Sequence, residues 1–323
     1  MKEKYVGNVN ISRILSQPAK SSSKQSTTKP LYKGPTKQSK SASKKSIASP
    51  KSLTNDLNLK YNPKHSLSQK IIKPDQRVQS YTANLFSNAR FKLDWSIYEF
   101  KNLPHNRQAE EFDAEQDVEE ASKPQKKITP IYDPRDYKDL PEVLFLGRCN
   151  VGKSSLINSL IDKPLARVKR FAGLTPCLNT YNIGNVVRLV DSPGYGVKGK
   201  QWQGELTMQY IRERQQLRKI YLILNAHLGI NEFDEMILSQ LVESKISFDL
   251  VFNKVDKISP AQRRTHCDQI VEQLLKTSQI SKLMRPTLHF VSCNDDNTRT
   301  LSGISDLQLN IVLSSGISGR FTR

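Results

Sequence analysis

The stretch LPEVLFLGRCNVGKSSLINSL, residues 140–160, decides the fold of this chain. Its apolar run VLFL is typical of a buried strand, and KSSLINSLI has the spacing of a helix. Between them, GRCNVGKS fits the pattern G-x-x-x-x-G-K-[ST]. The glycines let backbone N–H groups curl around phosphate oxygens, and the following helix points its positive dipole end at the same anion. The stretch therefore predicts a loop that binds a polyphosphate.

Individual residues of this loop have distinct expected roles. Lys153 can reach the β and γ phosphates of a nucleotide, and the Ser154 hydroxyl can coordinate Mg²⁺. We expect the backbone of the loop and of the first helical turn to supply the other phosphate contacts, from Gly147, Asn150, Val151, Gly152 and Ser155.

A second motif, DSPG at residues 191–194, ends the strand pattern VVRLVD. Asp191 can hold Mg²⁺ through water, and the N–H of Gly194 can contact the γ-phosphate. Thr175 lies in the loop before the strand pattern LNTYNI and is the candidate for a second Mg²⁺ hydroxyl. We expect three residues to act in catalysis: Lys153, Thr175 and Gly194.

The four residues NKVD predict which base the bound nucleotide carries. They begin at Asn253 and directly follow the strand pattern FDLVF. The carboxylate of Asp256 can accept hydrogen bonds from the ring N–H and the exocyclic amine of guanine, a donor pair that adenine lacks. Lys254 is expected to lie along the base and brace the phosphate loop. A backbone N–H of Ser292, Cys293 or Asn294 can bind the guanine oxygen.

Strand and helix patterns alternate along residues 138–318, which predicts an α/β fold. We expect a P-loop GTPase domain with a six-stranded, mostly parallel sheet and helices on both faces. Residues 76–137 form an N-terminal extension with an acidic loop at 109–120, where seven of the twelve residues are Asp or Glu. Within the extension, residues 80–100 are expected to form a short helix or a strand that packs on the main domain.

The first 75 residues have a different composition. Residues 1–80 hold 17 Lys and Arg against 3 Asp and Glu, a net charge of +14 out of +19 for the 323-residue chain. Because this Ser- and Lys-rich segment has little apolar surface to bury, we expect it to be disordered. A cleaved mitochondrial targeting segment is the favoured interpretation. A basic arm for nucleic acid and a solvated tail without a function are the alternatives.

The four cysteines form no CxxC pair and have no metal-ligand spacing with the five histidines. Free thiols in a reducing compartment are therefore expected. No apolar run reaches the ~18 residues that a membrane-spanning helix needs, so no membrane span is expected. We also expect a monomer.

The ordered series GRCNVGKS, GLTP, DSPG, NKVD and SCN resembles the translation-factor-related GTPases, and among these the EngB (YihA/YsxC) family. The stretches LARVKRFAGLTPCLN and VDSPGYG, with Trp202 downstream, are specific to this likeness. The resemblance implies a GTPase that binds GTP or GDP with Mg²⁺ and helps to assemble the large ribosomal subunit. The long basic extension resembles that of a fungal mitochondrial member. This likeness implies that the protein is located in the mitochondrial matrix and that its partner is rRNA or the large ribosomal subunit.

Three positions depart from the family pattern. Ser192 replaces a small or apolar residue, Asn253 replaces Thr, and Asn225 in NAHLG replaces an acid, which leaves the role of that loop open.

Tyr195 follows DSPG, where a Ras-like enzyme has a glutamine that positions water. We therefore expect slow intrinsic hydrolysis that a partner or a monovalent cation accelerates. Asn150 favours K⁺, because an Asn at this place helps to coordinate K⁺ in related cation-activated GTPases. A hydrogen bond that stabilises the loop is the alternative role for Asn150.

The flexible segment GYGVKGKQWQ is expected to move on hydrolysis, and its Lys198 and Lys200 either contact rRNA or are simply solvated.

Two other functions stay open. One is a GTP-dependent ribosome-binding module with negligible hydrolysis. The other is a P-loop kinase or ATPase, against which Asp256 argues.

Overall fold

The computed structural model describes seven ranges of the chain: residues 75–104, 139–168, 175–196, 199–243, 246–277, 286–293 and 303–317. Several predicted features lie outside the described residues: positions 1–74 of the basic tail, the acidic loop at 109–120, Lys198 and Asn294.

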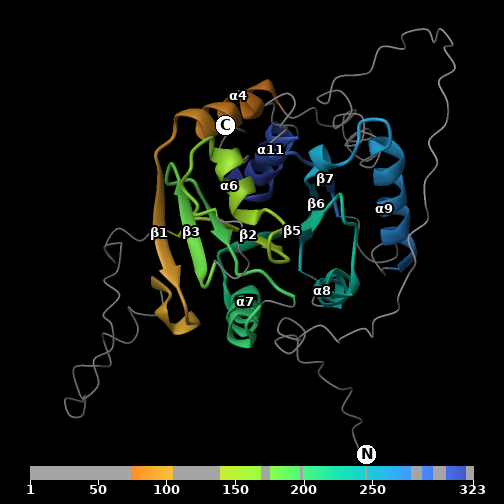
Figure 1. Ribbon diagram of the computed structural model, residues 1–323. Helices are drawn as coiled ribbons and strands as arrows, with labels where there is room; N and C mark the ends of the chain where they lie inside the picture. Colours follow the sequence, from red (N-terminus) through yellow and green to blue (C-terminus); the bar gives the residue numbers. More distant parts are fainter. Residues whose placement is uncertain are drawn as a thin grey trace, which may run out of the picture.

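One sheet of seven strands forms the centre of the molecule, in the order β1-β3-β4-β2-β5-β6-β7 (Figure 1). Strand β3 runs antiparallel to its two neighbours, and the other four pairings are parallel, which confirms the mostly parallel sheet. The strands are β1 (Phe91–Ile97), β2 (Glu142–Gly147), β3 (Leu178–Ile183), β4 (Val187–Asp191), β5 (Leu217–Asn225), β6 (Phe248–Asn253) and β7 (Leu288–Phe290).

The predicted count of six strands is wrong, because β1 adds a seventh at the edge of the sheet. Its pairing with β3 runs from Phe91 opposite Ile183 to Ile97 opposite Leu178. The segment 80–100 has mixed apolar spacing because a helix and a strand meet within it. The helix is α4 (Gln76–Asn88), and the strand is β1.

Helices cover both faces of the sheet, as the sequence predicts (Figure 1). Side chains of β2 alternate between the two apolar cores: Val143 and Phe145 point into one, Leu144 and Leu146 into the other. The first core includes α4, α6 (Lys153–Ile161) and α11 (Ile304–Ser314). The second includes α7 (Gln201–Glu213), α8 (Glu232–Glu243) and α9 (Arg263–Thr277). Short 3₁₀ turns, η1 (Phe100–Asn102) and η3 (Val255–Lys257), complete the described elements.

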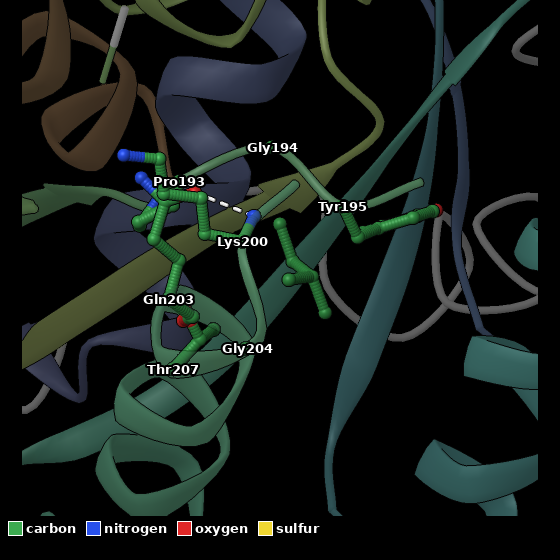
Figure 2. Close-up of a pocket in the computed structure, with 8 residues that line it drawn as sticks. Pro193, Gly194, Tyr195, Lys200, Gln203, Gly204 and Thr207 are labelled. Carbon is green, nitrogen blue, oxygen red and sulfur yellow. Dashed lines mark hydrogen bonds between the residues drawn. The ribbon is translucent and has the colours of Figure 1, made fainter. Parts of the chain in front are cut away.

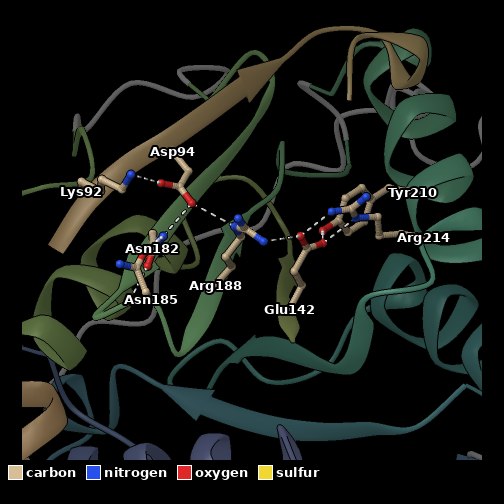
Figure 3. Close-up of polar contacts among 8 residues, drawn as sticks. All are labelled: Lys92, Asp94, Glu142, Asn182, Asn185, Arg188, Tyr210 and Arg214. Atoms are coloured by element: carbon tan, nitrogen blue, oxygen red, sulfur yellow. Dashed lines mark hydrogen bonds and ion pairs between the residues drawn. The ribbon is translucent and has the colours of Figure 1, made fainter. Parts of the chain in front are cut away.

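A buried chain of ion pairs joins β1 to the rest of the domain (Figure 3). The carboxylate of Glu142 accepts from Arg214 Nε and Nη2 at 2.7 and 2.6 Å, and from the Tyr210 hydroxyl. Arg188 Nη1 lies 3.7 Å from Glu142, and its Nε donates to Asp94 at 2.9 Å. Each of these five side chains is buried, so the chain of contacts connects β1, β4, β2 and α7 inside the protein.

We predict that Arg188→Met lowers the free energy of unfolding by about 3–5 kcal/mol, because it removes the cation between two buried carboxylates, Asp94 and Glu142. Urea unfolding measures this change. Lys92→Met is the matched control, since Lys92 pairs with the same Asp94 at 3.2 Å but its side chain is 46% exposed. Its expected loss is below about 1 kcal/mol. Equal losses in the two variants would contradict a special role for the buried pair.

Candidate nucleotide-binding site

The loop from Gly147 to Lys153 joins the end of β2 to the start of α6. A Cβ at Gly147 would lie 2.6 Å from the carbonyl oxygen of Ile223. At Gly152, φ is +103° and a Cβ would lie 2.5 Å from the side-chain amide of Asn253. Neighbouring strands thus approach this loop so closely that only glycine fits at both ends.

Lys153 occupies the centre of the loop. Its side chain is buried, and Nζ donates to the carbonyl oxygens of Gly147 at 2.9 Å and Arg148 at 3.1 Å. Burial lowers its pKa, while the nearby Asp191 carboxylate acts in the opposite direction. Ser155, two residues further on in the first turn of α6, is half-buried. The free N–H groups of this first turn are suited to bind an anion.

Ser154 and Asp191 meet at the same end of the sheet. Ser154 Oγ donates to Asp191 Oδ2 at 2.6 Å, while Asp191 Oδ1 is buried and has no hydrogen-bond partner among the described residues. Burial raises the pKa of Asp191 to about 6, and Lys153 and Ser154 oppose this shift. A hydroxyl and a carboxylate with one unpartnered oxygen are hard oxygen ligands, so this pair fits Mg²⁺. Thr175, the other predicted ligand, is half-buried.

Two side chains from the end of β6 hold the phosphate loop. Asn253 Nδ2 donates to the carbonyl oxygen of Val151 at 3.0 Å. Lys254, with φ at +65°, reaches the carbonyl oxygen of Asn150 with Nζ at 2.6 Å. The structure thus joins the predicted base motif to the predicted phosphate motif across about 100 residues of sequence.

The predicted base-binding residues lie together at the ends of β6 and β7. Ser292 Oγ donates to Asp256 Oδ1 at 3.0 Å, and Cys293 Sγ contacts Asn253 Oδ1 at 3.3 Å. Burial raises the pKa of Cys293 to about 12, so the thiol stays protonated. The side chain of Asp256 is 7% exposed, and its hydrogen bond from Ser292 fixes the orientation of the carboxylate.

The DSPG loop lies directly against the phosphate loop. Cys149 N donates to Tyr195 O at 3.1 Å, and Tyr195 N donates to Gly147 O at 3.3 Å. A Cβ at Gly194 would lie 2.7 Å from the Cα of Cys149, so this approach requires glycine. The departure at Ser192 is accommodated, because its buried hydroxyl donates to the carbonyl oxygen of Phe145 at 2.8 Å.

A buried cluster beside the phosphate loop was not predicted from the sequence. Tyr195 Oη donates to Asp234 Oδ1 at 2.7 Å, and Arg148 Nη2 lies 3.1 Å from Asp234 Oδ2. Arg148 also donates to the carbonyl oxygen of Gly229 at 3.0 Å. In the sequence Arg148 fills a variable position of the motif, and Asp234 is one of three acids in the first turn of α8. No local signal distinguishes them.

Asn225, which stands where the family has an acid, shapes the loop that reaches this cluster. Its side-chain oxygen accepts from the backbone N–H groups of His227 at 3.0 Å and Leu228 at 3.1 Å. An amide oxygen can make these contacts as a carboxylate would, so the loop keeps a defined shape that leads to Gly229.

A cavity of about 10 Å³, the size of one water molecule, separates the DSPG loop from the start of α7 (Figure 2). Beside it, Lys200 N donates to Gln203 Oε1 at 3.0 Å, and Gln203 Nε2 donates to Pro176 O at 3.2 Å. The first turn of α7 is therefore tied to the segment that follows Thr175. The cavity is lined by Leu146, Pro193, Gly194, Tyr195, Lys200, Gln203, Gly204 and Thr207.

We predict that Asp234→Ala lowers the free energy of unfolding by about 3 kcal/mol or more, because it leaves the Arg148 guanidinium and the Tyr195 hydroxyl without their carboxylate. Glu232→Ala, an exposed acid in the same helical turn, is the control and should cost less than about 1 kcal/mol. Denaturant unfolding compares them, and similar losses would sink the prediction.

Comparisons with known proteins found similar sequences and a similar structure. A family model described as "50S ribosome-binding GTPase" matches residues 142–254. The chain is 35% identical over 196 residues to MIOREX complex component 8 of Saccharomyces cerevisiae, covering 58% of this chain and 59% of the yeast protein. In the crystal structure of Toc33 from Arabidopsis thaliana in complex with GDP and Mg²⁺, the similar part covers 55% of this chain and 85% of that one, with 20% identity and a TM-score of 0.44.

The chain is also 40% identical over 145 residues to a protein of Roseobacter denitrificans named probable GTP-binding protein EngB. That match covers 43% of this chain and 67% of the bacterial protein. The fold is that of a P-loop GTPase, and the chain belongs to the EngB family of GTP-binding proteins.

Proposed function

We propose that this protein binds GTP with Mg²⁺, hydrolyses it slowly to GDP and phosphate, and acts as a switch on the mitochondrial large ribosomal subunit. One observation carries the proposal: side chains that begin the base motif, Asn253 and Lys254, hold the phosphate loop through Val151 and Asn150. A single ligand with both a base and a polyphosphate tail would fit this joined pair of motifs.

Guanine is the base that the site supports. The Asp256 carboxylate is oriented by Ser292 and can accept from the two donors on the guanine edge. Adenine has no such donor pair there, so its binding would leave a largely buried acceptor without a partner. This argues against a P-loop kinase or ATPase.

We expect Asp256→Asn to weaken GTP binding by at least tenfold and to improve xanthosine triphosphate binding, because an amide can donate to the second xanthine oxygen. Competition against a fluorescent GTP analogue measures both affinities, with ATP as a further competitor. Glu243→Gln, at an exposed acid that ends α8, is the control and should leave both affinities unchanged. If ATP displaces the analogue as well as GTP does, the assignment of the base fails.

The residues present fit Mg²⁺ through Ser154 and Asp191, with Thr175 as the proposed second hydroxyl. When bound, the cation would neutralise charge on the β and γ phosphates. Lys153 would add a second positive charge beside them, and the N–H of Gly194 would donate to the γ-phosphate. These groups orient the phosphates and stabilise developing charge.

Slow hydrolysis follows from the position of Tyr195. Its phenol is buried and donates to Asp234, so it does not serve as the residue that positions water. Burial and the Asp234 carboxylate raise its pKa well above the ordinary value, so it also cannot act as a base. Acceleration must therefore come from a partner or a cation.

We expect faster hydrolysis in KCl than in NaCl, with Asn150 as a K⁺ ligand. Asn150 is exposed, and among the described residues its hydrogen bond is made by the backbone oxygen to Lys254, which leaves the side chain available. Asn150→Gly keeps the positive φ of +61° and should abolish the difference between the salts while GTP still binds. Equal wild-type rates in the two salts would remove the K⁺ role.

Ribosome binding is supported by the description of the matching family model. Mitochondrial matrix localisation is supported by the acid-poor composition of the first 75 residues. Co-sedimentation with mitochondrial large subunits, with a GTP analogue and with GDP, tests both the partner and the switch. Binding with no hydrolysis, even with subunits and K⁺, would instead favour a GTP-dependent binding module.

A further inference from the structure

Two aromatic side chains lie exposed next to each other on the surface near the nucleotide loops. Tyr98 is 41% exposed and Trp202 is 37% exposed, with ring centroids 6.3 Å apart and planes tilted by 33°. Among the large apolar side chains exposed in the described residues, these two alone are aromatic. Exposed rings of this kind usually contact a partner, because burying one contributes more than burying most other side chains.

The pair connects segments on both sides of the nucleotide site. Trp202 lies in the first turn of α7, which follows the DSPG loop, and its neighbour Gln203 donates to Pro176 at 3.2 Å. Tyr98 follows β1, and its hydroxyl lies next to the Cys177 thiol, just after Pro176. The first turn of α7, which carries Trp202, borders the DSPG loop, so a change in that loop can reach the aromatic pair.

Two exposed basic residues lie near the rings, Arg167 in space and Lys200 in sequence. Arg167 is exposed and lies close enough to Tyr98 for its charge to act on the tyrosine pKa, and Lys200 is exposed two residues before Trp202. Of the acids nearest the rings in sequence, Glu99 pairs with Lys101 at 3.2 Å, whereas Glu205 accepts from the neutral Gln201 amide at 2.9 Å and keeps its charge. The surface thus offers two stacking rings, with the exposed Arg167 guanidinium close to Tyr98.

We propose that Tyr98 and Trp202 form a stacking site for an unpaired base of single-stranded RNA, with Arg167 and Lys200 contacting the adjacent phosphates. This inference rests on the proposed function, and it specifies how an RNA partner would be held. Stacking on exposed aromatic rings is typical of single-stranded RNA recognition, whereas duplex bases are already stacked. An RNA partner is favoured over a protein because Arg167 and Lys200 are exposed cations and the matching family model is described as a ribosome-binding GTPase.

Trp202 itself reports on binding. The chain has two tryptophans, and Trp95 is 4% exposed in the core, so a ligand at the surface can quench only Trp202. We expect a 12-nucleotide single-stranded RNA to quench this emission and the matching duplex to do so weakly. Binding should differ between the GTP-analogue and GDP states.

Variants are compared by the anisotropy of the same RNA carrying a dye. Trp202→Ala should weaken binding about 5- to 100-fold, and Trp202→Phe should retain most of it, because a phenyl ring still stacks. Leu313→Ala is the control, at an apolar residue of similar exposure on α11. Binding of the fluorescent GTP analogue, measured on every variant, reports whether the domain stays folded.

Three outcomes would overturn the stacking site: unchanged RNA affinity in Trp202→Ala, equal losses in Trp202→Ala and Trp202→Phe, or equal binding of single strand and duplex. If Trp202→Ala binds RNA normally but no longer sediments with large subunits, the pair contacts a ribosomal protein and the proposal is wrong. A wild-type protein that binds the GTP analogue but not RNA would refute only this site. A wild-type protein that fails to bind the GTP analogue would refute the proposed function itself.

Discussion

The amide side chain of Asn253 holds the phosphate loop against the end of β6. Its Nδ2 donates to the carbonyl oxygen of Val151 at 3.0 Å. A Cβ on Gly152 would lie only 2.5 Å from the same Nδ2 atom. The loop can take this path only because Gly152 has no side chain and can adopt φ of +103°. One contact thereby fixes the curvature of the loop and its distance from the base motif, the two quantities on which nucleotide binding depends.

The same close packing continues on the other side of the loop. Backbone hydrogen bonds join Cys149 and Gly147 to Tyr195, and the Tyr195 side chain passes on to Asp234 at the start of α8. Because Arg148 pairs with the same carboxylate, the phosphate loop and the DSPG loop share one buried anchor. A movement of the DSPG loop would therefore have to break these backbone hydrogen bonds.

Sequence patterns predicted the parts of this site whose chemistry depends on residue type at fixed spacing. The strand, turn and helix of residues 140–160, the glycines and Asp191 are of this kind, because each is dictated by local backbone geometry or by its place at a strand end. Asp234 and Arg148 could not be predicted, since their partnership depends on tertiary contacts between residues 86 positions apart. Strand β1 was ambiguous because its apolar spacing merges with that of α4, and only pairing with β3 separates them.

The helix α4 and the strand β1 are structurally part of the domain, and this explains how Tyr98, just after β1, can contribute to a surface near the nucleotide loops. The buried chain from Asp94 through Arg188 and Glu142 to Arg214 connects β1 with the end of α7 (Figure 3). Tyr98 directly follows β1, and Trp202 lies at the other end of α7. The rings are thus carried by two elements that the ion pairs hold together, so their relative position is set by the buried contacts and by the first turn of α7. Of these two, only the turn borders the DSPG loop, and it is there that a nucleotide-dependent change would reach the aromatic pair.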